Sequence, residues 1–159
     1  SDCRIKRGKR YMKFVKINDN EKTRYMELLL IADEQISMIE KYLYHGDMFA
    51  LYDTDVRAIC VVTQEQLGIY ELKNIATVPQ YQRKGYGKNL IQFIVDYYKK
   101  YGRELYVGTG NCPAILRFYE RCGFVKSHIV KNFFDDNYDH PMYEDGHQLI
   151  DMIYLKRSL

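Results

Sequence analysis

Long hydrophobic runs and paired cysteine motifs are both absent from this sequence of 159 residues. No apolar run approaches the roughly 18 residues that a membrane-spanning helix needs, so no membrane association is expected. The four cysteines form no CxxC pair and have no histidine at zinc-ligand spacing, so we expect free thiols in a reducing compartment and no metal site. No signal-peptide pattern opens the chain, which favours a cytoplasmic protein.

Tryptophan is also absent, and most of the aromatic residues are tyrosines. The remaining composition, with 47% apolar and 28% charged residues, is that of an ordinary globular protein. The length corresponds to one domain that is large enough to bury a core.

The positive charge is concentrated at the start of the chain. Residues 1–11 contain five basic residues and one acid, so this segment carries the positive charge while the remainder is slightly acidic. We interpret residues 1–11 as a loose basic arm or a non-native extension, and residues 12–159 as a single domain. A nucleic-acid contact through this arm is the alternative, but no basic helix follows it, which makes such binding unlikely as the main role.

The hydrophobic pattern predicts alternating strands and helices. Strands are predicted at 12–17, 70–78, 105–107, 124–133 and 149–155, and a hairpin at 48–63. Helices are predicted at 21–43, either one bent helix or two short ones broken near Ala32 and Asp33, and from Lys84 or Gly85 to about residue 101. A last helix is predicted at 111–122, with Asn111 as its N-cap. This order predicts an α/β or α+β fold with a central mixed sheet and a right-handed parallel strand-helix-strand unit.

A glycine-containing stretch joins the strand at 70–78 to the following helix. A helix N-terminus offers unpaired N–H groups and a partial positive charge, so it is suited to bind an anion. Gly85 and Gly87 would let a phosphate approach the backbone, and several successive N–H groups suit a pyrophosphate. The Walker pattern is absent, and Leu90 replaces the third glycine of the dinucleotide fingerprint. Taken alone, this stretch could equally be a flexible basic loop.

A second motif, NCPAILRFYERCGF at residues 111–124, follows about 25 residues later. Together with QRKGYG at 82–87, it resembles the GNAT N-acetyltransferase family from about Met12 to the C-terminus. The tail at 132–152 looks like that of a group of small bacterial acetyltransferases. The resemblance implies a largely antiparallel mixed sheet of about six or seven strands, about four helices and a splayed parallel strand pair.

The resemblance also implies how acetyl-CoA, the co-substrate, would be held. The pyrophosphate would meet the segment from Gln82 to Lys88, and the pantetheine arm would pair with the backbone of Ile75 and Thr77 and meet Asn111. The complete set of implied acetyl-CoA contacts is Ile75, Ala76, Thr77, Gln82, Arg83, Lys84, Gly85, Tyr86, Gly87, Lys88 and Asn111.

Two residues are candidates for the chemistry of acetyl transfer. In the family a backbone N–H, here that of Ala76 or Thr77, usually meets the thioester oxygen, and a tyrosine, here Tyr119, stands near the sulfur as general acid. The alternative for Tyr119 is a packed core tyrosine. Glu71 is the candidate base, directly or through water, although it could be a solvent-facing carboxylate. Strand alternation predicts that Glu71 shares a face with Lys73 and Ile75, and that Leu72, Asn74 and Ala76 share the other.

The acceptor would bind near the segment between the last two strands. Residues 135–145 contain five acidic residues and two tyrosines but no lysine or arginine. This composition favours a cationic amine, such as a polyamine, an aminoglycoside or a peptide amine, although a merely solvated acidic loop is equally compatible. A non-catalytic acetyl-CoA sensor remains the alternative function. Family members are often dimers, so a homodimer is expected from the resemblance.

Overall fold

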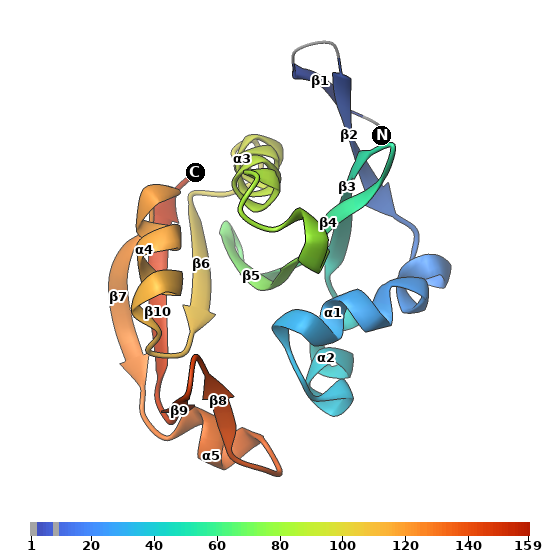
Figure 1. Cartoon of the computed structure of the whole chain (residues 1–159). Coiled ribbons are helices and arrows are strands. Elements are labelled where there is room, and N and C mark those ends of the chain that lie inside the picture. The colour runs from blue at the N-terminus through green and yellow to red at the C-terminus, as the bar shows by residue number, and fades with distance from the viewer. Residues whose placement is uncertain (1–2, 8–9) are drawn as a thin grey trace.

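The computed structural model describes residues 3–7 and 10–159, with side chains from Met12 onward. A twisted sheet of eight strands, in the order β1-β2-β3-β4-β5-β6-β10-β7, forms its centre (Figure 1). Its strands are β1 (Cys3–Arg7), β2 (Arg10–Ile17), β3 (Asp47–Asp53), β4 (Asp55–Gln66), β5 (Ile69–Thr77), β6 (Glu104–Thr109), β7 (Val125–Val130) and β10 (Met152–Ser158). Neighbouring strands are antiparallel except β5 and β6, which confirms the predicted mixed sheet with one parallel pair.

Helices cover both faces of the sheet. The helices are α1 (Met26–Ala32), α2 (Ile36–Leu43), α3 (Tyr86–Tyr98), α4 (Pro113–Arg121) and α5 (Phe133–Asn137), with short 3-10 turns η1 (Asp19–Tyr25) and η2 (Pro79–Tyr81). Apolar side chains of α3 and α4 pack on one face, and those of α1 and α2 pack on the other. Two hydrophobic clusters, one on each side of the sheet, therefore hold the strands at the centre of the molecule.

The region 21–43 contains two separate α-helices, which agrees with the prediction of two short helices and not with that of one bent helix. After α1, Asp33 takes an extended backbone conformation with φ −141° and ψ 105°, and α2 begins three residues later. Thr54, with φ 73°, lies between the predicted hairpin strands β3 and β4. Both features follow local sequence signals, which explains why they could be predicted.

The segment between β7 and β10 has more structure than the predicted connection. It contains α5 and a small hairpin of β8 (Met142–Glu144) and β9 (His147–Leu149). Asp145 and Gly146 form the turn with φ 49° and 78°, which is typical of a two-residue type I′ hairpin. The Asp-Gly pair was the sequence signal for this hairpin, and the prediction missed it.

The N-terminal arm is partly described. Residues 3–7 form β1, which pairs with β2, and β2 begins two residues before the predicted first strand. The remaining residues of the arm, 1–2 and 8–9, lie outside the described residues. The described part is thus an edge strand of the sheet rather than a loose arm.

Candidate active site

The parallel strands β5 and β6 separate along their length. Their pairing runs from Ile69 with Glu104 to Leu72 with Val107 and then stops. Beyond that point β5 remains paired with β4, and β6 remains paired with β10. The facing edges of β5 and β6 therefore have unpaired backbone groups, which an extended ligand could satisfy as an added strand.

A β-bulge marks the place where the strands separate. Val61 of β4 opposes Asn74 and Val62 opposes Leu72, so Lys73 is the extra residue on β5. The bulge reverses the faces of the strand: Leu72 belongs to the cluster beneath α3 and α4, whereas Ala76 belongs to the cluster beneath α1 and α2. The prediction that Leu72, Asn74 and Ala76 share a face is therefore wrong, because regular alternation does not continue through a bulge.

The bulge also changes the surroundings of Glu71. Ile75 packs toward α3 and α4, opposite to Ala76. Glu71 alternates with Leu72, so it lies on the side of Ala76 and Asn74 and does not share a face with Ile75. The predicted shared face of Glu71 and Ile75 is wrong for the same reason.

The loop before α3 has the geometry of an anion site. Gly85 is the N-cap of α3 with φ 87°, a conformation that side chains disfavour. Gly87 lies one residue into the helix, where a Cβ would be 3.4 Å from Cζ of Phe118 and 3.6 Å from Oγ1 of Thr77. Gly85 thus permits the turn, and Gly87 permits close packing of α3 against α4 and β5.

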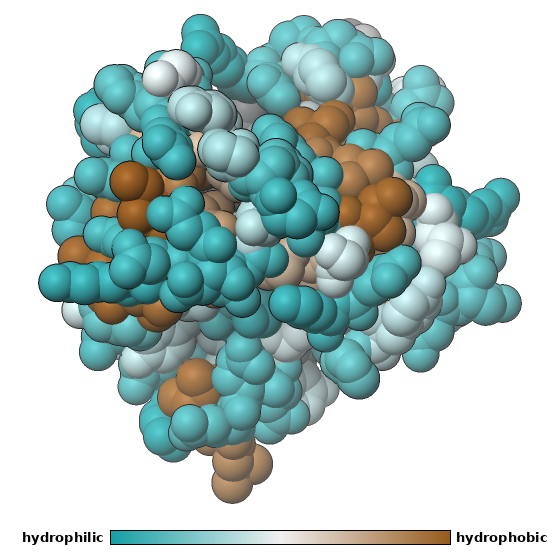
Figure 2. All heavy atoms as spheres, turned by 90° about the horizontal axis from the view of Figure 1, so that it is seen from below, coloured by the Kyte–Doolittle hydropathy of each residue, from teal (hydrophilic) through white to brown (hydrophobic). Residues whose placement is uncertain are grey.

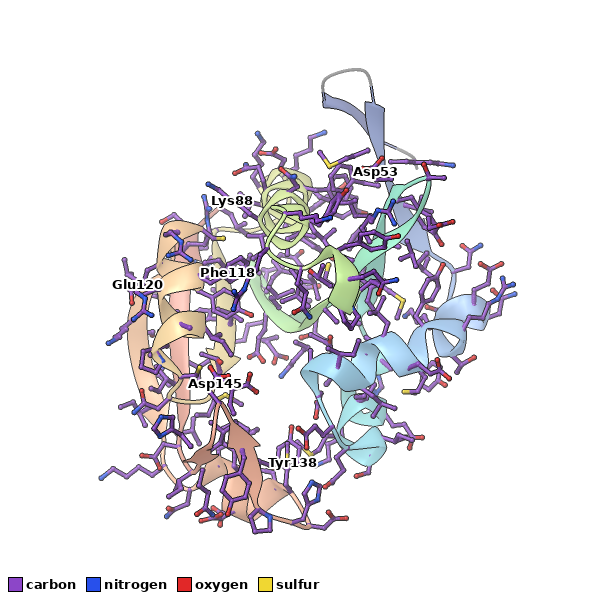
Figure 3. The ribbon with its side chains drawn as sticks, viewed as in Figure 1. Asp53, Lys88, Phe118, Glu120, Tyr138 and Asp145 are labelled. Carbon is purple, nitrogen blue, oxygen red and sulfur yellow. The ribbon has the colours of Figure 1, made fainter. Side chains whose placement is uncertain are left out.

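Cationic side chains surround this helix N-terminus. Arg83, Lys84 and Lys88 are exposed, and Figure 3 shows Lys88 on α3 beside Phe118 of α4. Arg83 has φ 61°, so the loop takes the left-handed conformation at two positions close together, and only at Arg83 does a side chain make it costly. Successive backbone N–H groups, the start of a 13-residue helix and three cations together suit a pyrophosphate.

Two predicted loop residues have side chains that turn inward or back. The buried Tyr86 donates a hydrogen bond to Asp53 Oδ2 at 2.8 Å, so it can offer a ligand only its backbone N–H. Gln82 Nε2 donates to the carbonyl oxygen of Thr77 at 3.3 Å and ties the loop to the end of β5.

A residue that the sequence reading missed supports the loop from below. Arg57 of β4 is only 8% exposed, and its guanidinium lies 3.6 Å from the centre of the Tyr81 ring. Its Nε and Nη1 atoms are buried without a hydrogen-bond partner within the described chain. Arg57 is the extra residue of a second bulge, opposite Leu51 and Tyr52, so regular strand alternation did not reveal its position.

The N-terminus of α4 differs from the prediction. Cys112, not Asn111, is the N-cap, and it makes no side-chain capping hydrogen bond. Asn111 is exposed and lies one residue before the N-cap, so it is not the predicted capping residue. Pro113 occupies the first turn as predicted, because the missing N–H has no helical partner there.

Tyr119 of α4 is a core residue with its hydroxyl unused. Its side chain is 7% exposed and packs edge-on against Phe124, with 5.7 Å between ring centres. No hydrogen bond to its hydroxyl is found within residues 12–159. Burial raises the pKa of Tyr119, so the phenol stays protonated at neutral pH.

Glu71 belongs to an ion-pair cluster. Lys73 Nζ lies 2.7 Å from Glu71 Oε2 and 3.0 Å from Glu65 Oε1. Burial raises the pKa of Glu71, and the charge of Lys73 partly offsets this effect. Glu71 is thus neither the solvent-facing carboxylate of one alternative nor an unpaired base.

A third group of polar residues lies across the opening from β5. The α1–α2 turn meets the segment after α5, where Tyr138 donates a hydrogen bond to Asp33 Oδ1 at 2.8 Å. The backbone N–H of Asp139 donates to Gln35 Oε1 at 3.1 Å. Figure 3 shows Tyr138 between α5 and the helices α1 and α2. Asp33 and Tyr138 are 105 residues apart, and no sequence signal linked them.

Comparisons with known proteins agree with this geometry. Residues 44–126 match the acetyltransferase (GNAT) domain family. An uncharacterized N-acetyltransferase of Bacillus subtilis, YvbK, is 31% identical over 148 residues, which cover 91% of this chain and 96% of that protein. This chain belongs to the GNAT family of acetyltransferases.

Two further GNAT proteins are similar to it. A GNAT acetyltransferase from Elizabethkingia anophelis, solved with acetyl-CoA bound, has 32% identity and a TM-score of 0.87, covering 93% of this chain and 98% of that one. The ribosomal protein bS18-alanine N-acetyltransferase of Escherichia coli is 35% identical over 98 residues, 60% of this chain and 63% of that protein. The chain is accordingly an acetyl-CoA-dependent N-acetyltransferase with the GNAT fold, and β1 extends its sheet.

Membrane-spanning helices and metal-binding clusters are both absent from the described residues. Along the part of the chain that is described, no helix is both long and apolar enough to cross a bilayer. Within the same residues, no three His, Cys, Asp or Glu side chains are placed so that they could hold a metal ion.

Proposed function

We propose that this enzyme transfers the acetyl group of acetyl-CoA directly to a primary amine of a cationic small molecule or a peptide. The observation that carries the proposal is the end of the β5–β6 pairing after Leu72. The unpaired part of β5 lies against the basic N-terminus of α3 at Thr77 and, through Asn74, is bonded to Tyr42 of α2. Two substrates could thus meet between the strands from opposite sides of the sheet.

The loop from Gln82 to Lys88 would hold the pyrophosphate with its backbone N–H groups. Arg83, Lys84 and Lys88 supply compensating charge, and the unpaired edge of β5 from Ile75 to Thr77 would pair with the pantetheine arm. The backbone N–H of Ala76 or Thr77 would donate to the thioester oxygen as negative charge develops on it. Asn111, exposed before α4, would approach the pantetheine from the side of β6.

Tyr119 would donate its proton to the departing CoA sulfur. The raised pKa of Tyr119 keeps the phenol protonated until the thiolate forms. Within residues 12–159 no hydrogen bond competes with the ligand for its hydroxyl. Glu71 would accept the proton of the attacking amine, directly or through water. Its ion pair with Lys73 keeps the carboxylate charged despite burial, which a proton acceptor requires.

The acceptor is inferred to be cationic from the charge at the end of the molecule that carries α2, α5 and the β8–β9 hairpin. Seen from this end, the surface is mostly hydrophilic, with hydrophobic atoms in separate patches (Figure 2). The acidic residues of 135–145 are exposed at this end, and Asp145 accepts a weak hydrogen bond from the Cys112 thiol at 3.6 Å. A polar, acidic approach favours positively charged amines over apolar ones.

Calorimetry with acetyl-CoA tests the first half of this proposal. Gly85→Asp places an anion where the pyrophosphate is expected, so acetyl-CoA binding should be lost. Gly146→Asp is the matched control, since Gly146 also has positive φ, 78°, but has no atom near its Cβ position and lies in the β8–β9 turn instead of the loop before α3.

The outcomes separate the possibilities. Micromolar binding by the parent and by Gly146→Asp, with none by Gly85→Asp, supports the loop as the pyrophosphate site. Binding by all three proteins would place the pyrophosphate elsewhere. Binding without acetylation of any amine in a panel of polyamines, aminoglycosides and peptides would instead favour a sensor.

A further inference from the structure

Asp33, in the turn between α1 and α2, is a carboxylate without a countercharge. Tyr42 donates a hydrogen bond to its Oδ2 at 3.1 Å, and Tyr138 donates to its Oδ1 at 2.8 Å. The backbone N–H of Gln35 is its third donor. None of these donors is charged, and no lysine, arginine or histidine pairs with Asp33 within the described residues. Burial raises the pKa of Asp33, and these hydrogen bonds only partly offset that effect, so a cation beside the carboxylate would stabilise its ionised form.

Asn74 adds an unpaired acceptor to the same network. Its side chain is 4% exposed, and its Nδ2 donates to the Tyr42 hydroxyl at 3.0 Å and to the Leu29 carbonyl at 3.0 Å. Its Oδ1 is buried without a donor within the described chain. Oδ1 and Nδ2 belong to one amide group, so this unpaired oxygen is attached to the network that joins Asn74, Tyr42 and Asp33. A buried amide oxygen without a donor is costly, so such an atom indicates a missing partner.

Both groups lie on the face of the sheet that α1 and α2 cover, which we call the acceptor side. Asn74 is two residues before Ala76 on β5 and faces α1 and α2, as its bonds to Leu29 and Tyr42 require. Asp33 is linked to Asn74 through the Tyr42 hydroxyl, by two successive hydrogen bonds of 3.1 and 3.0 Å. One full negative charge and one amide oxygen match an ammonium group, which has three N–H donors and no acceptor.

We propose that Asp33 and Asn74 bind a non-reacting ammonium group of the acceptor, which is therefore a diamine or polyamine. This inference rests on the proposed acetyl transfer and specifies its acceptor. The nucleophilic amine must be neutral, whereas an alkylamine with its usual pKa of about 10 is protonated at neutral pH. A carboxylate stabilises the charged form of a neighbouring amine, so an ammonium held by Asp33 is not the nucleophile. A second amino group on the same molecule would then reach the thioester near Ala76.

Calorimetry with two matched probes tests this inference independently of turnover. The probes are cadaverine, a linear diamine, and 1,5-pentanediol, in which hydroxyls replace both amino groups. With the protein saturated with CoA, the parent should bind cadaverine about 10- to 100-fold more tightly than pentanediol, as expected for hydrogen bonds to a charged group. In Asp33→Asn this preference should disappear, because the amide keeps the shape of the carboxylate without its charge.

Glu34→Gln is the matched control. Glu34 is the exposed neighbour of Asp33, so its replacement removes the same charge from the same turn without touching the Tyr42 and Tyr138 hydroxyls. The preference for cadaverine should survive in this variant. If Asp33→Asn does not fold, Tyr138→Phe replaces it, because without this donor the carboxylate is no longer held in position and the preference should fall.

Equal affinity of the parent for both probes would overturn the inference, as would a preference that survives Asp33→Asn. Measured acetylation separates this failure from failure of the proposed function. Acetylation of cadaverine by Asp33→Asn at the kcat/KM of the parent would leave acetyl transfer intact and remove the ammonium site. A preference for cadaverine that depends on Asp33, without any acetylation, would support the ammonium site and contradict the proposed transfer.

Discussion

At the scale of single residues, burial determines what the polar groups of the site can do. Tyr119 and Glu71 both have raised pKa values, with desolvation as the largest cause, but the consequences are opposite. A phenol that holds its proton more tightly remains a proton donor at neutral pH. A carboxylate that holds its proton more tightly is a stronger base, provided that it is still ionised, and the nearby Lys73 favours ionisation.

Tyr119→Phe should lower kcat about 100-fold or more and leave the affinity for acetyl-CoA unchanged. The phenylalanine ring keeps the contact with Phe124, so only the proton donor is lost. Steady-state kinetics and calorimetry give the two quantities. An unchanged kcat would return Tyr119 to the role of a packed core residue.

Lys73→Met should move the acidic limb of the plot of kcat against pH toward higher pH. Lys73 lowers the pKa of Glu71, so its removal raises that pKa further, and the carboxylate then becomes protonated at a higher pH than in the parent. Glu71→Gln should abolish the limb altogether. A limb that stays in place in both variants would mean that Glu71 is not the base.

At the scale of elements, the bulges of β4 and β5 position residues of the candidate site. The bulge at Lys73 ends the pairing with β6, and the bulge at Arg57 turns a guanidinium beneath the loop before α3. Arg57 leaves two N–H groups unpaired in a buried position, so it is a poor choice for stability alone. Its stacking on Tyr81 instead suggests that it holds η2 in place.

Arg57→Met should weaken acetyl-CoA binding roughly tenfold, as expected for a partly desolvated cation–π contact that orders the loop. Thermal stability should be unchanged or slightly higher, because methionine fills a similar volume without buried unpaired donors. Lys99→Met, which removes an exposed cation at the other end of α3, is the control. A large loss of stability in Arg57→Met would assign Arg57 a structural role.

At the scale of the whole molecule, the segment between β7 and β10 connects the β7 edge of the sheet to the α1–α2 turn. It leaves the far edge of the sheet and reaches the α1–α2 turn through the hydrogen bonds of Tyr138 and Asp139 (Figure 1). The acceptor side is thereby bounded by the first and last parts of the chain. A contact of this kind can position α5 and the hairpin relative to β5.

Tyr138→Phe should accelerate amide hydrogen exchange across residues 133–149 and raise KM for the amine, without changing acetyl-CoA affinity. The ring retains its stacking on Phe134, with 5.6 Å between ring centres, so the variant removes only the hydrogen bond to Asp33. Tyr143→Phe, on the exposed β8 strand, serves for comparison and should behave like the parent. Unchanged exchange in Tyr138→Phe would show that Asp139 and the packing of α5 suffice.

The sequence by itself determined the features that depend on neighbouring residues. The order of strands and helices, a bend or break near Ala32 and Asp33, and a helix start close to Gly85 all follow from hydrophobic period, turn residues and helix ends. The two motifs at 82–87 and 111–124 also identified the family, because the residues of each motif are close together in the chain. Even the missed β8–β9 hairpin had a local signal in Asp145 and Gly146.

The tertiary structure alone decided which side chains meet. A bulge depends on the register of the partner strand, so the opposite faces of Leu72 and Ala76 could not be read from alternation. The contact of Asp33 with Tyr138 joins residues 105 positions apart, and the pairing of such residues depends on how all intervening elements pack. The turn and helix start between β5 and α3 were therefore predictable from the sequence, whereas the contact between the α1–α2 turn and the segment after α5, assembled from distant segments, was not.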